Sequence, residues 1–77
     1  MSREPVPEWL LAQRRRVGDR VRELRNEREL SQEQLAHLAD VARHSVYRTE
    51  LGTHAASIDL LGRIARALGV EVSSFFN

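Results

Sequence analysis

The hydrophobic pattern of the chain predicts helices. Val17, Val21 and Leu24 are spaced so that they fall on one side of a helix, while the charged residues between them face water. Two further sets of apolar residues have helical spacing. The shorter set comprises Leu35, Leu38 and Ala39, and the longer set comprises Ile58, Leu61, Ile64, Ala65 and Leu68. These spacings favour an all-α protein with its helices packed around one core.

Ser31 and Gln34 mark the start of a helix. At this spacing a serine hydroxyl and a glutamine side chain can each satisfy a free backbone N–H at a helix N-terminus. The pattern then breaks at Asp40, a residue type that tolerates the left-handed backbone better than most. A second helical piece follows from Ala42, so this part of the chain is expected to form two short helices joined by a tight turn. The side chains expected to hold them together are Ala36, Ala39, Val41 and Val46.

The N-terminal segment allows two structures. Residues 1–7 contain both prolines and are expected to be extended or disordered, with helical structure starting near Glu8. From there the chain either runs directly into the first helix or forms a separate turn joined at Gly18. We therefore divide the chain into an N-terminal extension, residues 1–13, and a single domain, residues 14–77.

Trp9 and the run of three arginines from Arg14 to Arg16 each allow two interpretations. Trp9 either caps the core of its own domain or packs on a second subunit. The three arginines form either a solvated helix face or a non-specific contact with DNA phosphates, which would attract a duplex without recognising its sequence. The sequence leaves both choices open.

The last helical segment has clear end signals. Ser57 is a good N-cap, Asp59 follows in the first turn where the helix dipole favours negative charge, and Gly69 stands at the C-terminal end. Beyond it, Ser73 is expected to cap a final short turn.

Four apolar residues lie among the last eight of the chain, and they are Val70, Val72, Phe75 and Phe76. This is more apolar surface than a small domain readily covers, and an exposed apolar patch usually marks association. We expect the four residues to form a homodimer interface. The alternative is that Phe75 closes the core and Phe76 frays.

Composition says more about the size and cellular location of the protein than about its function. A chain of 77 residues forms one domain with a limited core. It has no cysteine, which removes disulfides and thiolate metal sites, and it has no apolar run near the ~20 residues of a membrane helix. A cytoplasmic protein is therefore expected. The net charge of +1 does not reveal a nucleic-acid binder. All 12 cationic residues are Arg, which either reflects coding bias or suits phosphate recognition.

Residues 31–52 resemble the helix-turn-helix of the phage-repressor and Cro family, commonly called XRE-type. The segment VGDRVRELRNERELS resembles the first helix of that family, and SIDLLGRIARALGVEVSSFF resembles its fourth and fifth helices. The similarity thus runs from Val17 to Phe76. It implies a compact five-helix, lambda-repressor-like domain whose third helix lies in the major groove of double-stranded DNA. Phage repressors and the small controller proteins of restriction–modification systems are the relatives that it suggests.

The resemblance implies two sets of DNA contacts. Base edges would be read by Arg43, His44, Tyr47 and Arg48. The DNA backbone would be contacted by Gln32, Ser45, Thr53 and His54. Because arginine can donate two hydrogen bonds to guanine, we expect guanines in each half-site. DNA binding would also depend on pH if the charged form of His44 contacts a phosphate.

The resemblance further implies a structural ion pair between Arg25 and Glu50. Breaking one side of a buried pair costs roughly 3–5 kcal/mol, so loss of Arg25 is expected to loosen the domain before it affects any base contact. Four positions depart from the family pattern, and they are Asp40, Ala42, Thr49 and Leu51.

A transcriptional regulator of this family is expected to bind as a homodimer. Two-fold symmetry places two recognition helices roughly 34–36 Å apart, which calls for a pseudo-palindromic operator. No effector domain is visible, so neither a cofactor nor a small-molecule effector is expected. The alternative is an antitoxin or another protein-interaction module that uses the apolar C-terminus.

An enzyme is not expected. The three histidines, His37, His44 and His54, lack acidic partners at a recognisable spacing, and no glycine-rich phosphate loop is present. We therefore assign no catalytic residue and no metal ligand.

Overall fold

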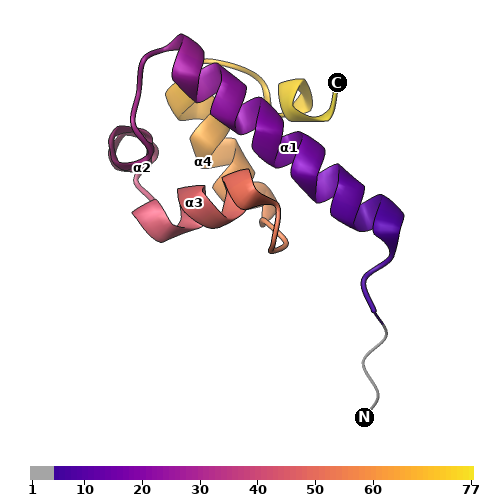
Figure 1. Ribbon diagram of the computed structural model, residues 1–77. Helices are drawn as coiled ribbons and strands as arrows, with labels where there is room; N and C mark the ends of the chain where they lie inside the picture. The colour runs from indigo at the N-terminus through magenta and orange to yellow at the C-terminus, as the bar shows by residue number, and fades with distance from the viewer. Residues whose placement is uncertain (1–4) are drawn as a thin grey trace.

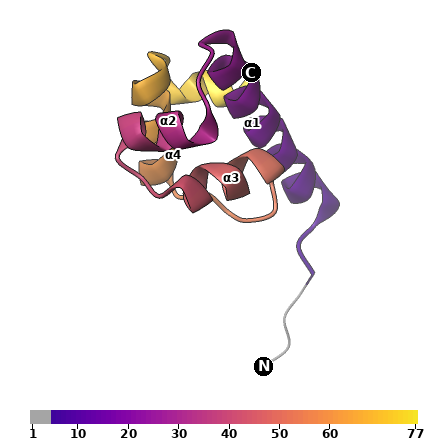
Figure 2. The same ribbon diagram turned by 60° about the vertical axis from the view of Figure 1, so that its left-hand side comes forward.

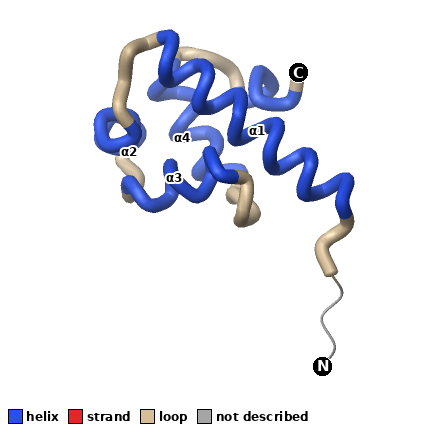
Figure 3. The backbone as a smooth tube through the Cα atoms, viewed as in Figure 1, coloured by secondary structure: helices blue, strands red, loops and turns tan. Residues whose placement is uncertain are grey.

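The computed structural model describes residues 5–77, and every regular element in that range is helical (Figures 1 and 3). Residues 1–4, part of the expected N-terminal extension, lie outside the described residues. The elements are α1 Glu8–Glu27, α2 Gln32–Ala39, α3 Arg43–Leu51, α4 Ile58–Leu68 and a 3₁₀ helix, η1, Val72–Phe76. The expected all-α fold with five helices is therefore present, with the fifth helix formed by a 3₁₀ turn.

Helix α1 is continuous from Glu8 to Glu27. It begins directly after Pro7, whose extended backbone and missing N–H suit that position. The helix passes through Gly18 without a break, so the segment from Glu8 is the first part of the same helix and not a separate turn. At 1.5 Å per residue, its 20 residues reach about 30 Å, longer than the rest of the fold can cover.

Local capping signals define α2 and the turn after it. The Ser31 hydroxyl accepts a hydrogen bond from the Gln34 backbone N–H at 3.0 Å, and the Gln34 side chain accepts one from the Ser31 N–H at 2.8 Å. The helix ends at Asp40, which adopts the left-handed conformation with φ 56°. The next helix follows Ala42, which provides no side-chain cap. The predicted pair of short helices with a tight turn is confirmed.

The core lies where α1 crosses α3 and where α4 and η1 close over α1 (Figure 1). Its largest fully buried side chains are Phe75, Leu35, Ile64, Val21 and Val46. Two residues expected to be buried are instead exposed. Ile58 is 76% exposed because it begins α4, beyond the part of that helix that packs on the core, and Leu38 is 58% exposed because Leu35, Ala36 and Ala39 occupy the inward side of α2.

The C-terminal turn removes Phe75 from the expected dimer interface and agrees with the alternative in which Phe75 closes the core. Phe75 is only 1% exposed and belongs to the core, so it has no surface to offer a partner. Val70 and Val72 are half-buried against the same core, and Phe76 is 51% exposed. The N-cap of η1 is Glu71 rather than the expected Ser73, and no side-chain hydrogen bond caps the turn.

Two glycines allow α1 to approach the end of α3 closely. A Cβ atom on Gly18 would lie 2.4 Å from the Thr49 carbonyl oxygen and 2.6 Å from that of Glu50. Gly52 ends α3 with φ 70°, and a Cβ atom there would lie 2.9 Å from the Arg15 Cα. Backbone meets backbone at both points, which fixes how α3 lies against α1.

Within residues 5–77, no helix has the length and apolar character needed to cross a membrane.

Candidate nucleic-acid interface

One side of α3 points away from the other helices in both ribbon views (Figure 2). It carries the side chains expected to read DNA, namely Arg43, His44, Tyr47 and Arg48, and all four are exposed. Residues four apart lie one above the other on a helix, so these two adjacent pairs share one face. Across residues 5–77, none of the four side chains has a hydrogen bond or an ion pair to another residue. The face therefore presents donors and acceptors that the fold itself does not use.

The opposite side of α3 is held by an ion pair. Arg25 donates from Nε to Glu50 Oε2 at 2.7 Å and from Nη2 to Glu50 Oε1 at 2.9 Å, a two-pronged geometry that suits a guanidinium and a carboxylate. A third bond runs from Arg25 Nη1 to the carbonyl oxygen of Leu30 at 2.8 Å. The side chain of Glu50 is only 3% exposed and that of Arg25 is 13% exposed. The pair expected from the resemblance thus joins the end of α1 to α3.

The hydrogen bonds that Arg25 donates to the Glu50 carboxylate raise the pKa of Arg25 above its ordinary value, although partial burial acts in the opposite direction. A raised pKa stabilises the folded state at any pH below the ordinary value, and that contribution is lost only as the pH rises through the folded-state pKa. Because arginine already titrates far above neutrality, the guanidinium of Arg25 stays charged throughout the physiological range.

Gln32, expected to bind a DNA phosphate, has a partner inside the protein. Its side-chain Nε2 donates to Glu50 Oε1 at 3.1 Å, which adds α2 to the Arg25–Glu50 network. A glutamine amide has two N–H donors, so one remains free. The structure therefore gives Gln32 a structural role beside the expected one, and links the three helices through a single carboxylate.

Thr49 and Ser45 are also bonded within α3. Thr49 is 5% exposed, and its Oγ1 donates to the Ser45 carbonyl oxygen at 2.8 Å, so a hydroxyl on the inward face is fully satisfied. This explains how a polar residue occupies a position where the family usually has an apolar one. The Ser45 side chain is half-buried, at the margin of the outward face.

The loop after α3 contributes the last two expected backbone contacts. Thr53 and His54 are exposed, and a hydrogen bond of 2.9 Å joins Thr53 Oγ1 to His54 Nδ1. This bond leaves the other ring nitrogen of His54 free. The two side chains therefore lie together as one polar unit at the C-terminal end of α3.

Leu51 is an exposed residue of α3 for which the sequence suggested no role in binding. It is 45% exposed and lies one helical turn after Tyr47, so it places an apolar side chain on the outward face of α3. In the sequence, Leu51 stands out only as a departure from the family pattern. Its outward direction depends on the helix boundaries, which the pattern alone does not determine.

No metal centre is formed in the part of the chain that the structure describes. Among residues 5–77 there is no group of three or more His, Asp or Glu side chains that could hold a metal ion. Two surface ion pairs lie along α1, Arg20 with Glu23 and Arg22 with Asp19, and another joins Arg63 of α4 to Asp40 at 3.5 Å.

Two short helices with a tight turn, an inward side locked by an ion pair and an outward polar side define a helix-turn-helix domain. A family model described as helix-turn-helix matches residues 21–75, and the chain belongs to this family. The first part of α1 precedes the matched region.

Similar proteins are named as regulators. An immunity repressor protein of Bacillus phage phi105 is 38% identical over 58 residues, which cover 75% of this chain but only 40% of the repressor. An HTH-type transcriptional regulator of Methanothermobacter thermautotrophicus is 45% identical over 51 residues, which cover 66% of this chain and 74% of the regulator. These names agree with the expectation that the chain is not an enzyme.

A solved structure with the same fold is that of the restriction–modification controller protein C.AhdI from Aeromonas hydrophila. It shares 37% sequence identity with this chain and superposes with a TM-score of 0.81. The match covers 84% of this chain and 98% of the controller protein. The likeness to a small controller protein that the sequence suggested is thus confirmed at the level of the whole fold.

Proposed function

We propose that this protein is a cytoplasmic transcriptional regulator that binds double-stranded DNA as a homodimer at pseudo-palindromic operators. The observation that carries the proposal is the contrast between the two sides of α3. The inward side is fixed by the Arg25–Glu50 pair, whereas the outward side holds unbonded polar side chains. A rigid helix with free donors on its outer face is what direct readout in the major groove requires.

The outward face suits bases that offer acceptors. Arg43 and Arg48 can each donate two hydrogen bonds to the O6 and N7 atoms of a guanine, a contact worth about 1–3 kcal/mol of discrimination. His44 and Tyr47 lie beside them and complete the base-reading set. Leu51 extends this set with an apolar side chain that fits the methyl group of thymine.

The proposed contacts with the DNA backbone come from residues around the outward face of α3. The free amide donor of Gln32 lies at the N-terminus of α2, where the helix dipole favours a phosphate. Ser45 is at the margin of α3, and the Thr53–His54 unit follows its C-terminal end. These contacts set the position of α3 on the duplex and carry no sequence information themselves.

Operator selection followed by substitution tests the readout. Bound DNA would be selected from a random pool, and Arg43→Ala and Arg48→Ala measured on the selected site. Each change should weaken binding by about 1–3 kcal/mol and relax the preference at one base pair. Arg22→Ala, on an exposed face of α1, is the matched control and should leave the preference unchanged. If both α3 variants lost affinity but kept the full sequence preference, the base-reading roles would be wrong.

The homodimer is proposed to form through Val70, Val72 and Phe76, without Phe75. Phe76 is the most exposed apolar residue of this end of the chain, and the two valines lie beside it. Phe76→Ser should shift the protein toward monomer in sedimentation equilibrium and weaken operator binding. Leu38→Ser, an equally exposed apolar position on α2, is the control and should leave the association unchanged. Equal association of all three proteins would contradict this interface.

The rival role, a protein-interaction module, would use the same apolar C-terminus as the proposed dimer, so the burial of Phe75 does not distinguish the two roles. A steep salt dependence would favour DNA as the partner. The logarithm of the binding constant would then fall, for each tenfold rise in salt concentration, by about 0.9 per phosphate neutralised. Co-purification with an unrelated small protein, together with failure to select any DNA, would favour the rival.

A further inference from the structure

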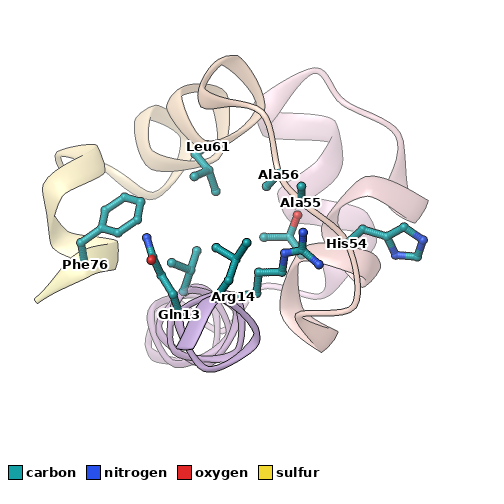
Figure 4. Close-up of a pocket in the computed structure, with 10 residues that line it drawn as sticks. Gln13, Arg14, His54, Ala55, Ala56, Leu61 and Phe76 are labelled. Carbon is teal, nitrogen blue, oxygen red and sulfur yellow. The ribbon is translucent and has the colours of Figure 1, made fainter. Parts of the chain in front are cut away.

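A pocket of about 230 Å³ lies on the side of the molecule formed by the first half of α1 (Figure 4). Leu10 and Val17 line it from α1, Leu61 lines it from α4, and Phe76 borders it at the end of η1. The loop between α3 and α4 closes the remaining side, where Ala55 and Ala56 lie. The walls are therefore mostly apolar and come from four separate parts of the chain.

Arg14 places a permanent positive charge in this apolar pocket. Its Nε atom is out of contact with water and has no hydrogen-bond partner. Within residues 5–77, Arg14 has no ion pair, and none of the described residues that line the pocket is acidic. An unpartnered buried donor is costly. Arg14 is itself only half-buried, but its Nε donor faces this pocket without a partner among the described residues.

The volume limits what could bind this donor. A water molecule occupies about 30 Å³ of the liquid, so the pocket has room for roughly seven waters, or for one organic molecule of about ten non-hydrogen atoms. Typical pockets for drug-sized ligands start near 300 Å³, so a small ligand is required. One charged group at the edge of an apolar surface selects a molecule that is anionic at one end and apolar at the other.

We propose that this pocket binds a small organic carboxylate, with the carboxylate on Arg14 and the apolar part between Leu10 and Leu61. An aromatic monocarboxylate fits best, because Phe76 at the border offers a ring to pack against. The proposal does not depend on DNA binding. It departs from the expectation that no small molecule binds, which considered only a separate effector domain and not a pocket within the domain.

Phenylacetate is the probe, and phenylacetamide is its neutral counterpart of equal size. Each would be titrated into the full-length protein, with binding measured by calorimetry and located by the backbone amide shifts of Ala55 and Ala56. Phenylacetate should bind once per chain and at least about tenfold more tightly than the amide, since a charge-assisted pair is stronger than a neutral one. Saturation should shift the amide signals of both alanines.

Two variants test the charge of Arg14 and the space in the pocket separately. Arg14→Gln should reduce phenylacetate affinity about tenfold and leave phenylacetamide affinity unchanged, while Arg16→Gln, the exposed neighbour in the same run, should change neither. Ala55→Leu narrows the pocket from an exposed position that the core does not need, and it should weaken both ligands. Thermal melting of each variant establishes that it is folded.

Three outcomes would overturn the proposal. The first is the lack of saturable binding of phenylacetate, and the second is equal loss of affinity in Arg14→Gln and Arg16→Gln, which would indicate surface charge alone. The third is saturable binding that leaves the amide signals of Ala55 and Ala56 unchanged, which would place phenylacetate outside the pocket. None of these outcomes depends on the operator experiments, so the two proposals can fail separately.

Discussion

Each end of α1 carries a partly buried arginine, but only one of the two arginines has partners among the described residues. Near the C-terminal end, Arg25 donates three hydrogen bonds and is paired with the buried carboxylate of Glu50. Near the N-terminal end, Arg14 is half-buried and has neither an ion pair nor a hydrogen bond within residues 5–77. The helix is continuous between them, so the difference lies in what packs against each end. Only the Arg25 end contributes its charge to the stability of the fold.

The same contrast extends to packing. Between Val17 and Leu24, α1 faces the core and approaches the α3 backbone directly at Gly18. Before Val17, it borders an open pocket and exposes Trp9, which is 67% exposed. A charge without a partner beside an unfilled cavity lowers stability, and proteins tolerate such features where binding uses them. The comparison therefore predicts opposite effects of substitutions at the two ends.

The largest effect is expected from Arg25→Ala. It leaves Glu50 buried without its cation and should lower the free energy of unfolding by roughly 3–5 kcal/mol. Urea denaturation measures this change, and Arg22→Ala, an exposed neighbour on α1, should alter stability by no more than about 0.5 kcal/mol. Because the contribution of the raised pKa of Arg25 is fully present below the ordinary arginine pKa and is lost only at high pH, the deficit should be constant across neutral pH. An unchanged melting temperature would refute the structural role of the pair.

Gly18→Ala should have the next largest effect. The added methyl group would press on the carbonyl oxygens of Thr49 and Glu50, and overpacking of this kind costs about 1–3 kcal/mol. Gly62→Ala on α4 is the matched control, because the added Cβ would meet no atom within 4 Å apart from its chain neighbours and the backbone of its own helix. That variant should be more stable by up to about 1 kcal/mol through helix propensity alone. Equal effects of the two changes in thermal denaturation would show that α1 and α3 can separate without cost.

Arg14→Met tests the other end of the helix. Methionine keeps a long flexible side chain in the same space and removes the unpartnered donor, so stability should rise by about 1 kcal/mol. Arg16→Met, at an exposed position, should change it by less than about 0.5 kcal/mol. The change is measured by urea denaturation without added carboxylates. A loss of stability in Arg14→Met would mean that Arg14 is paired in solution.

The smallest effect is expected from Trp9→Ala. Because most of its side chain already contacts water, its removal should change the unfolding free energy of the monomer by about 0.5 kcal/mol or less. Fluorescence is not usable in the variant, which lacks the only tryptophan, so circular dichroism follows the unfolding. A deficit that grows with protein concentration would instead place Trp9 on a second subunit, and a large deficit at low concentration would place it in the core.

Local signals in the sequence predicted the helix ends well. The Ser31–Gln34 capping box, the Ser57 cap and the glycine stop at Gly69 each depend on residues close together in the chain, and each is present in the structure. The left-handed conformation of Asp40 was also predicted, whereas the same conformation at Glu29, with φ 54°, had no signal in the residue type. Glutamate is not a residue that favours this backbone, so only the surrounding fold explains it.

Features that depend on residues far apart were harder to predict. A glycine such as Gly18 can either interrupt a helix or allow another helix to approach closely. Only the position of α3 shows that Gly18 allows a close approach. The Gln32–Glu50 hydrogen bond joins residues 18 positions apart, and the pocket beside Arg14 needs four segments to form. The sequence leaves Phe75 either at a dimer interface or in the core, because nothing local shows which way η1 turns its ring; the structure places it in the core. Of the expected DNA contacts, the sequence indicated the residues but not their partners within the fold.

The outward face of α3 also determines what could be exchanged by design. Arg43, His44, Tyr47 and Arg48 take part in none of the hydrogen bonds or ion pairs formed within residues 5–77, and the close contacts of Gly18 are with the backbone of Thr49 and Glu50. Under the proposed function, folding and operator choice therefore depend on different residues of one nine-residue helix. A library randomised at the four outward positions should remain largely folded while its members recognise different operators, which makes this helix an exchangeable specificity module.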